Sequence, residues 1–186
     1  MATEVLTEKA IVNIVRVEIV TVEDTPKTYQ FDTASEAAYS AVVSEGEETI
    51  LRVKNEIKGI NRTEDIQYGC DLTLKQPVFV PEVLAIVDGG TLTKGSDGAV
   101  TGYTPPVQGS AVKRTMFTLN IYTEEKDADT TTVGYQKFSF KGCKGKPASF
   151  NFKDGEFMAP EYTIMSRVKK GTAPYELTFL DALPTA

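Results

Sequence analysis

The chain lacks histidine and tryptophan altogether, and it has only two cysteines among its 186 residues. Because no imidazole is present, mechanisms that use histidine as a base or as a metal ligand are excluded. Cys70 and Cys143 are too few to build a disulfide-held scaffold. We therefore predict that the protein is not an enzyme, with no catalytic, cofactor-binding or metal-ligating residues, and that it needs no cofactor.

Long hydrophobic runs are also missing. The most apolar stretch, Ile11 to Val22, is interrupted by Asn13, Arg16 and Glu18 and is too short to span a bilayer. Residues 1–10 are polar and lack the basic and then apolar pattern of a secretion signal. We expect a soluble chain made in a reducing cytoplasm, without a membrane partner, in which residues 1–10 form a flexible N-terminal arm.

Basic residues are outnumbered, with 20 Lys and Arg against 26 Asp and Glu, and the net charge is −6. The acidic excess lies in residues 1–93, whereas residues 94–186 are slightly basic. An acidic chain is a poor non-specific binder of nucleic acid, because phosphates are neutralised by clustered lysine and arginine. The asymmetry fits two interpretations: copies of the chain attract one another, or the charges are simply solvated.

What the chain does contain is strand-forming residues. Val, Ile, Thr, Tyr and Phe together make up more than a third of it, and these residues suit a pleated, half-buried surface. The length fits one domain, residues 1–186. We predict a mainly β fold, an antiparallel β-sandwich or partly closed barrel with one short packed helix at about residues 81–88.

Residues 66–75 give the clearest strand signal, with ten residues of period-two alternation. The apolar face would carry Ile66, Tyr68, Cys70, Leu72 and Leu74; the polar face would carry Gln67, Gly69, Asp71, Thr73 and Lys75. The helix prediction rests on Pro81 at the first helical position, on Glu82 at the positive end, and on Gly89-Gly90 as a stop.

Other segments are less sharply defined. Residues 35–45 fit a strand better than a short helix, Ser44 to Glu47 resemble a hairpin tip, and residues 48–55 would be the returning strand. Residues 91–110, rich in Gly, Pro, Ser and Thr, are predicted to be a long loop or a hairpin. Further strands are expected at 11–22, 28–32, 113–122, 133–141, 148–153, 162–168 and 175–180, with Phe138, Phe140, Phe150 and Phe152 supplying much of the later core.

Motifs for ligand chemistry are weak. Residues 90–96 superficially resemble a phosphate-binding loop, but Lys94 precedes the second glycine and the segment follows a helix instead of opening one. Lys141, Lys144 and Lys146 are expected on a glycine-containing turn, where they fit a phosphate contact, a solvated turn or an acidic protein partner such as the cluster Glu45, Glu47 and Glu48. Cys70 is expected to be buried, and Cys143 to be an idle surface thiol.

A family resemblance rests mainly on residues 44–90. They run through an acidic Ser-Glu-Gly-Glu-Glu turn, Ile-Leu-Arg-Val-Lys-Asn, Asn61-Arg-Thr-Glu-Asp65, the strand 66–75, the helix Pro-Glu-Val-Leu-Ala and Asp88-Gly-Gly90. Met-Ala-Pro-Glu-Tyr at 158–162 and the closing segment 175–184 add to the pattern. With these sequence segments in this order, the chain resembles the major tail tube proteins of tailed bacteriophages and of phage-tail-like bacteriocins.

The resemblance implies hexameric rings that stack into a hollow tube, a conduit for genome DNA or, in a bacteriocin, for ions. It implies a location in the virion tail after assembly in the bacterial host cytoplasm. The implied partners are the tape measure, the tail terminator and, where the tail has one, a sheath. Gln67, Asp71, Thr73 and Lys75 are then candidate lumen-facing residues, an inference from alternation. Glu45, Glu47, Glu48, Lys141, Lys144 and Lys146 are candidate inter-subunit contacts.

Two other classes of function stay open. A monomeric β-sandwich module that binds a carbohydrate or a cell surface would expose several aromatic side chains on one face. A hydrolase without histidine would need a pocket with carboxyl groups of shifted pKa.

Overall fold

The computed structural model describes residue 4 and residues 6–185. The elements within them are β1 (Ile11–Thr21), β2 (Thr28–Phe31), β3 (Glu36–Ser44), β4 (Glu48–Val53), β5 (Glu56–Arg62), β6 (Ile66–Lys75), α1 (Pro81–Asp88), β7 (Thr91–Lys94), β8 (Val100–Thr104), β9 (Phe117–Lys126), β10 (Thr132–Gly145), β11 (Glu161–Arg167) and β12 (Tyr175–Leu180). The predicted mainly β fold with one short helix is confirmed. The described residues include no helix that is long and apolar enough to cross a membrane.

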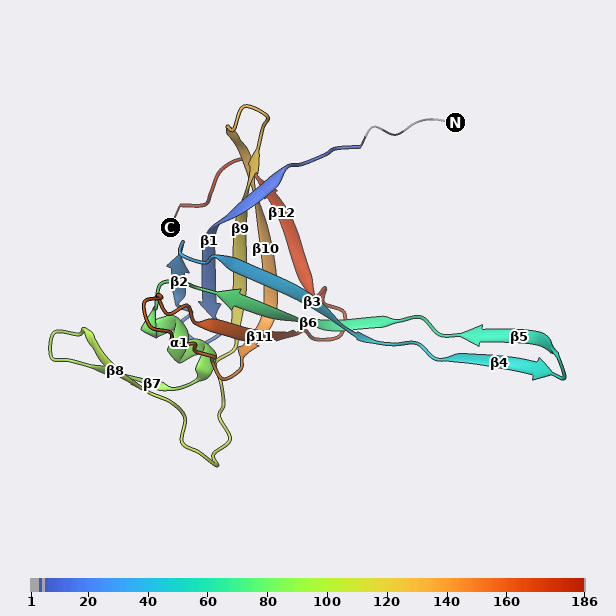
Figure 1. The fold of residues 1–186 in the computed structure, drawn as a ribbon, viewed down its shortest axis with the longest axis horizontal. Helices are drawn as coiled ribbons and strands as arrows, with labels where there is room; N and C mark the ends of the chain where they lie inside the picture. Colours follow the sequence, from blue (N-terminus) through green and yellow to red (C-terminus); the bar gives the residue numbers. More distant parts are fainter. Residues whose placement is uncertain (1–3, 5, 186) are drawn as a thin grey trace.

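Eight antiparallel strands form the main sheet, in the order β2-β1-β9-β10-β11-β6-β3, with β12 also paired to β10. Strand β10 pairs with β12 through Tyr135–Phe140 and with β11 through Cys143–Gly145. Between these two parts Gly142 adopts a positive φ of 65°. The sheet therefore bends into two layers whose strands cross (Figure 1), and it does not close into a barrel.

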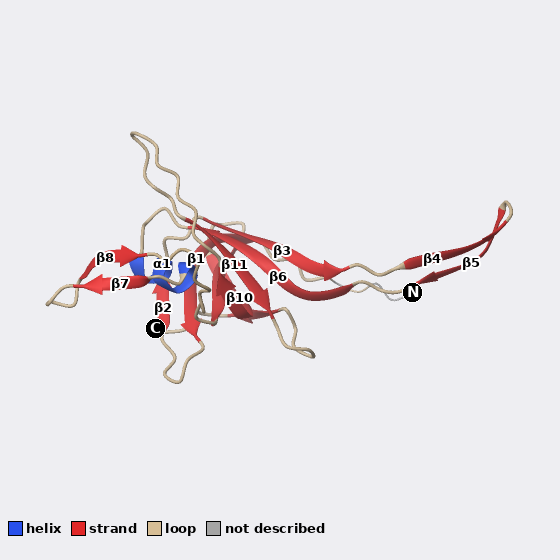
Figure 2. Ribbon diagram, turned by 90° about the horizontal axis from the view of Figure 1, so that it is seen from below, coloured by secondary structure: helices blue, strands red, loops and turns tan. Residues whose placement is uncertain are grey.

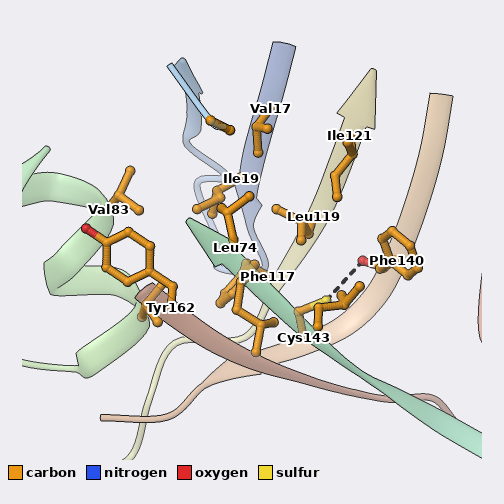
Figure 3. Packing of buried hydrophobic residues seen from close by; sticks show 14 of the residues in the cluster. Val17, Ile19, Leu74, Val83, Phe117, Leu119, Ile121, Phe140, Cys143 and Tyr162 are labelled. Carbon is orange, nitrogen blue, oxygen red and sulfur yellow. Dashed lines mark hydrogen bonds between the residues drawn. The ribbon is translucent and has the colours of Figure 1, made fainter. Parts of the chain in front are cut away.

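The core fills the space between the two layers. Val17 and Ile19 of β1 and Leu119 of β9 lie in it, opposite Leu74 of β6 and Tyr162 of β11 (Figure 3). All five side chains are at most 1% exposed. The apolar face predicted for residues 66–75 is thus confirmed for its second half, where Cys70, Leu72 and Leu74 are buried, whereas Ile66 and Tyr68 project beyond the core.

Cys143 is buried in this core, so its prediction as a surface thiol was wrong. Gly142 turns the chain inward at the bend, and the Cys143 thiol donates to the Phe140 carbonyl at 3.2 Å (Figure 3). Burial raises the pKa of the Cys143 thiol to about 12 and also raises the pKa of the Cys70 thiol. Both cysteines are therefore unreactive at neutral pH.

Helix α1 begins and ends where the sequence predicts. Pro81 opens it, and Gly89, with φ of 86°, closes it by donating its N–H to the Ala85 carbonyl at 3.0 Å. Val83, Leu84 and Val87 are buried against the sheet. The helix consequently covers one end of the core.

Residues 44–47 are not a hairpin tip, and residues 48–55 do not return along residues 35–45. Strand β3 pairs with β6, and β4 pairs with β5, so these four strands form one long hairpin that turns at Lys54. The Gly46 and Glu47 N–H groups donate to the side chains of Asp65 and Thr63 at 2.8 Å, which keeps the two sides together across the break. The distal part, residues 48–62, extends far from the body (Figures 1 and 2) and is called the arm below.

Residues 91–104 form a β-hairpin of β7 and β8, which is one of the two alternatives predicted for residues 91–110. Two other local predictions need correction. The strand expected at 113–122 begins only at Phe117, as β9. Residues 148–153 make a single bridge, Ser149 to Glu161, in place of a strand. Phe150 and Phe152 are accordingly 40% and 79% exposed and are not part of the core, unlike Phe140.

The predicted N-terminal arm falls partly outside the described residues, which exclude residues 1–3 and 5. Its last residues run along β9: the Ala10 carbonyl accepts from the Lys126 N–H at 2.9 Å, and Lys9 forms an ion pair with Glu125 at 2.7 Å.

Candidate assembly surfaces

The candidate lumen-facing residues lie on β6, and three of the four share its outer face. Asp71, Thr73 and Lys75 alternate with the buried residues of this strand. Asp71 pairs with Arg167 at 2.9 Å, and Lys75 pairs with Glu36 at 2.8 Å. The outer face of the layer formed by β11, β6 and β3 is therefore polar, with its charges largely matched.

Gln67 departs from that row. The pairing of β3 with β6 shifts between Val42 and Val43, so that Val42 faces Gly69 but Val43 faces Gln67. The Gln67 amide donates to the Tyr39 hydroxyl at 2.7 Å, and the Tyr39 ring packs near Phe140. A β-bulge thus turns Gln67 toward Tyr39, which lies on the core side of the sheet. A strict period of two predicts the opposite face for Gln67.

The acidic cluster Glu45, Glu47 and Glu48 lies at the root of the arm, where all three residues are exposed. The lysine cluster lies elsewhere: Lys141 and Lys144 belong to β10, and Lys146 directly follows it, so the expected turn is absent. Lys141 is already paired with Glu176 at 2.6 Å. No ion pair joins the two clusters within the described part of the chain.

An apolar groove that the sequence does not reveal runs along the open side of the sandwich, beside β3. It combines a hollow of about 210 Å³ with an adjoining one of about 180 Å³. The residues that line it include Ile14, Tyr39, Leu72, Phe138, Phe140 and Tyr175. It exists because β9, β10 and β12 extend beyond the three strands that cover them, a consequence of non-local pairing.

The β12 side of this groove adds more uncovered apolar surface. Tyr175, Leu177 and Phe179 pair opposite Phe140, Phe138 and Gln136, and therefore point toward the core side of the sheet. They are nevertheless 42%, 42% and 56% exposed. Neighbouring Gln136 and Thr123 are paired across β10 and β9, and their buried polar side-chain atoms have no hydrogen-bond partner within the described residues.

The arm is the other exposed feature. Every residue of β4 and β5 is exposed, including Ile50, Leu51, Val53, Ile57 and Ile60, which are 48–60% accessible. A two-stranded ribbon without a third strand or a covering helix is marginally stable in water. The apolar side chains of the arm are therefore left uncovered by the rest of the described chain.

Metal-ligand clusters and carboxyl groups of shifted pKa are the remaining candidates for a chemical site. The described residues contain no group of three or more Cys, Asp or Glu residues placed to hold a metal ion. The clearest carboxyl shift is at Glu124, where hydrogen bonds from Asn13, Lys126 and Thr132 lower its pKa to about 2. Glu124 is thus a structural link between β1, β9 and β10 in its ionised form.

Comparisons with known proteins give similarities to solved structures, including two from the anti-feeding prophage. No family model and no curated protein matches the chain. A chain of the cap that terminates the tube of the anti-feeding prophage is similar with a TM-score of 0.44 and 11% identity, over 97% of both chains. A chain of the anti-feeding prophage baseplate is similar with a TM-score of 0.36 and 12% identity, over 96% of this chain and 97% of that one.

Proposed function

We propose that the protein is a structural subunit of a phage-tail-like particle, whose copies join side by side into rings that stack as a hollow tube. The observation that carries this proposal is the open side of the sandwich. Strand β3 pairs only with β6 among the described strands, so its outer edge has unpaired backbone groups. The apolar groove lies directly beside that edge.

A strand from a second copy, laid along β3, would satisfy both features. It would accept and donate the free ladder hydrogen bonds, and it would extend the β11-β6-β3 layer across the groove and its β12 side. Unpaired edges and half-covered apolar faces are features that soluble monomers avoid. If the strand laid on β3 is a different strand of the second copy, the contact is heterologous, and such contacts close into a ring when the rotation between copies allows it.

Six copies in each ring, and passage of DNA or ions through the centre, follow from the resemblance in sequence to tail tube proteins. The outer face with Asp71, Thr73 and Lys75 would then line the lumen.

Glu45, Glu47 and Glu48 would meet Lys144 and Lys146 of a neighbour. Since exposed ion pairs each contribute only about 0.2–1 kcal/mol, this contact would appear as assembly that weakens at high salt. Tape measure and terminator proteins would contact the finished tube.

Negative-stain microscopy of the concentrated protein tests the proposal. The unmodified chain is expected to form rings or tubes of uniform width, and Leu177→Asp is expected to stay monomeric because it places a charge in the apolar contact. Thr178→Asp is the matched control, since it lies on the same strand but faces away from the groove. Compact monomers of the unmodified chain under every salt condition would refute the proposal and favour a monomeric binding module.

A further inference from the structure

The connection between β10 and β11, residues 146–160, exposes three phenylalanines and is called the phenylalanine loop here. Phe157 is 98% exposed and Phe152 is 79% exposed, and Phe152 stacks on Phe150 with ring centroids 6.3 Å apart. A hollow of about 360 Å³ lies beside them, lined by residues that include Lys75, Lys153, Glu156 and Glu161. A phenylalanine so exposed contributes nothing to the core, and clustered exposed aromatic side chains are typical of binding anchors.

The arm offers a matching apolar surface. Ile50 pairs directly opposite Ile60, and Ile57 pairs opposite Arg52, so the three isoleucines lie on one face of the ribbon. That face is hollowed by about 550 Å³ where Ile50, Arg52, Asn55 and Ile57 meet. A phenyl ring in this hollow would contact two isoleucine side chains and a guanidinium group, which favours the face of an aromatic ring.

The charges around the two surfaces are opposite in sign. Between residues 50 and 62 the arm has four basic side chains and one acidic side chain, Glu56. Around the phenylalanine loop, the four acidic residues Glu36, Asp154, Glu156 and Glu161 outnumber the three lysines, Lys75, Lys146 and Lys153. Opposite local charges accelerate association and fix its orientation.

The two surfaces lie far apart on the molecule. Strand β6 leaves the arm at Ile66 and reaches the hollow of the phenylalanine loop at Lys75, and ten strand residues span roughly 30 Å. The arm points away from the body, while the phenylalanine loop lies near α1, held there by the hydrogen bond from the Ala148 N–H to Asp88 (Figures 1 and 2). One copy therefore cannot join its own two surfaces, but two copies in line can.

We propose that the arm of one copy docks on the phenylalanine loop of a second copy, with Phe157 seated against Ile50, Ile57 and Arg52. The contact rests on the proposed function and adds to it a second interface, separate from the β3 edge. It is heterologous and runs along the long axis of the chain, so it repeats without closing and connects successive rings.

Crosslinking with a short bis-maleimide tests the pairing, because the native Cys70 and Cys143 are buried and do not react. Full-length Ile57→Cys is mixed in turn with Phe157→Cys, with Leu177→Cys in the groove and with Val107→Cys, an exposed control that is 75% accessible. We expect a crosslinked dimer with Phe157→Cys alone. A second measurement compares Phe157→Ala with the unmodified chain, and it should weaken end-to-end association at least about tenfold while rings persist.

Each other outcome is decisive. A crosslink to Leu177→Cys in place of Phe157→Cys would mean that the arm docks in the groove, and the inference would be wrong. Rings or tubes without the Phe157 crosslink, or with unchanged tube length in Phe157→Ala, would also overturn it while the proposed function stands. Absence of any association between copies would overturn both.

Discussion

At the residue scale, Asp88 holds three segments together at the end of α1. Its carboxylate accepts from the Tyr103 hydroxyl and, at 3.3 Å, from the Ala148 N–H, while its carbonyl accepts from Arg114 Nε at 3.0 Å. Asp88 is only 8% exposed, and burial with this hydrogen bond raises the pKa of the Tyr103 hydroxyl. The β7–β8 hairpin and the phenylalanine loop are thereby attached to the helix.

Asp88→Ala is expected to lower the free energy of unfolding by about 1–3 kcal/mol, because it leaves the partly buried Tyr103 hydroxyl and Ala148 N–H unpaired. Tyr103→Phe should cost less, and it should cost almost nothing further once Asp88 is absent. Urea unfolding of the two single variants and the double variant measures the coupling. Fully additive losses would show that the two side chains do not act as a pair.

Tyr122 makes the stability sensitive to alkaline pH. Its ring is 1% exposed and lies near Arg16 and Lys137, and its hydroxyl donates to Glu18 at 2.9 Å. Burial, followed by the hydrogen bond to Glu18 and its negative charge, raises the pKa of Tyr122 to about 12. A raised folded-state pKa means that the folded state holds the proton more tightly, so its stabilising contribution is complete below about pH 10, the ordinary tyrosine pKa.

This contribution should be lost as the pH rises from about 10 to about 12. We expect the unmodified chain to lose stability more steeply over this range than Tyr122→Phe, which has no proton to lose at this position. Tyr162, whose pKa burial also raises to about 12, remains in both proteins and cancels in the difference. Parallel unfolding curves for the two proteins across this range would contradict the prediction.

At the element scale, α1 depends on a glycine of β10 for its close approach. A Cβ atom at Gly145 would lie 2.0 Å from the Val87 carbonyl oxygen, so the helix and the strand pack backbone against backbone. Gly145→Ala is expected to cost about 2 kcal/mol or more, because the helix must move away from the core. Urea unfolding monitored by circular dichroism provides the measurement.

The matched control for this variant is Gly59→Ala in the arm. No atom lies within 4 Å of a Cβ built at Gly59, so this change should alter the unfolding free energy by no more than about 0.5 kcal/mol. Equal effects of the two substitutions would rule out close packing as the reason for Gly145.

At the scale of the whole molecule, the body and the arm have separable roles. The core lies entirely within the body, and no residue of β4 or β5 belongs to it. Ser44 pairs directly with Ile66 where the arm begins. Residues 45–65 can therefore be replaced by Asn-Gly, which forms a tight two-residue hairpin turn between these two positions.

The shortened chain is expected to fold with an unfolding free energy close to that of the full chain and to lose long polymers. Calorimetry measures the first property and microscopy the second. A chain that fails to fold would show that the arm is part of the cooperative unit. Tubes of normal length would show that the arm has no role in stacking.

The sequence by itself determined the features that neighbouring residues decide. The alternation of residues 66–75 predicted β6 to the residue, because the side-chain period of a strand is a local property. Pro81, Glu82 and Gly89 likewise predicted the limits of α1, since helix ends depend on adjacent residues. The polar outer row of Asp71, Thr73 and Lys75 followed from the same alternation.

Only the tertiary structure decided which segments meet. Turn-like residues 44–47 continue into an arm because β3 finds its partner in β6, more than twenty residues away in sequence. Phe150 and Phe152 have the hydrophobicity of core residues but no layer covers them, whereas Cys143 is buried because the chain bends at Gly142. The apolar groove exists because β9, β10 and β12 extend beyond the strands that cover them (Figure 1). Burial and strand pairing are non-local properties, and local pattern does not specify them.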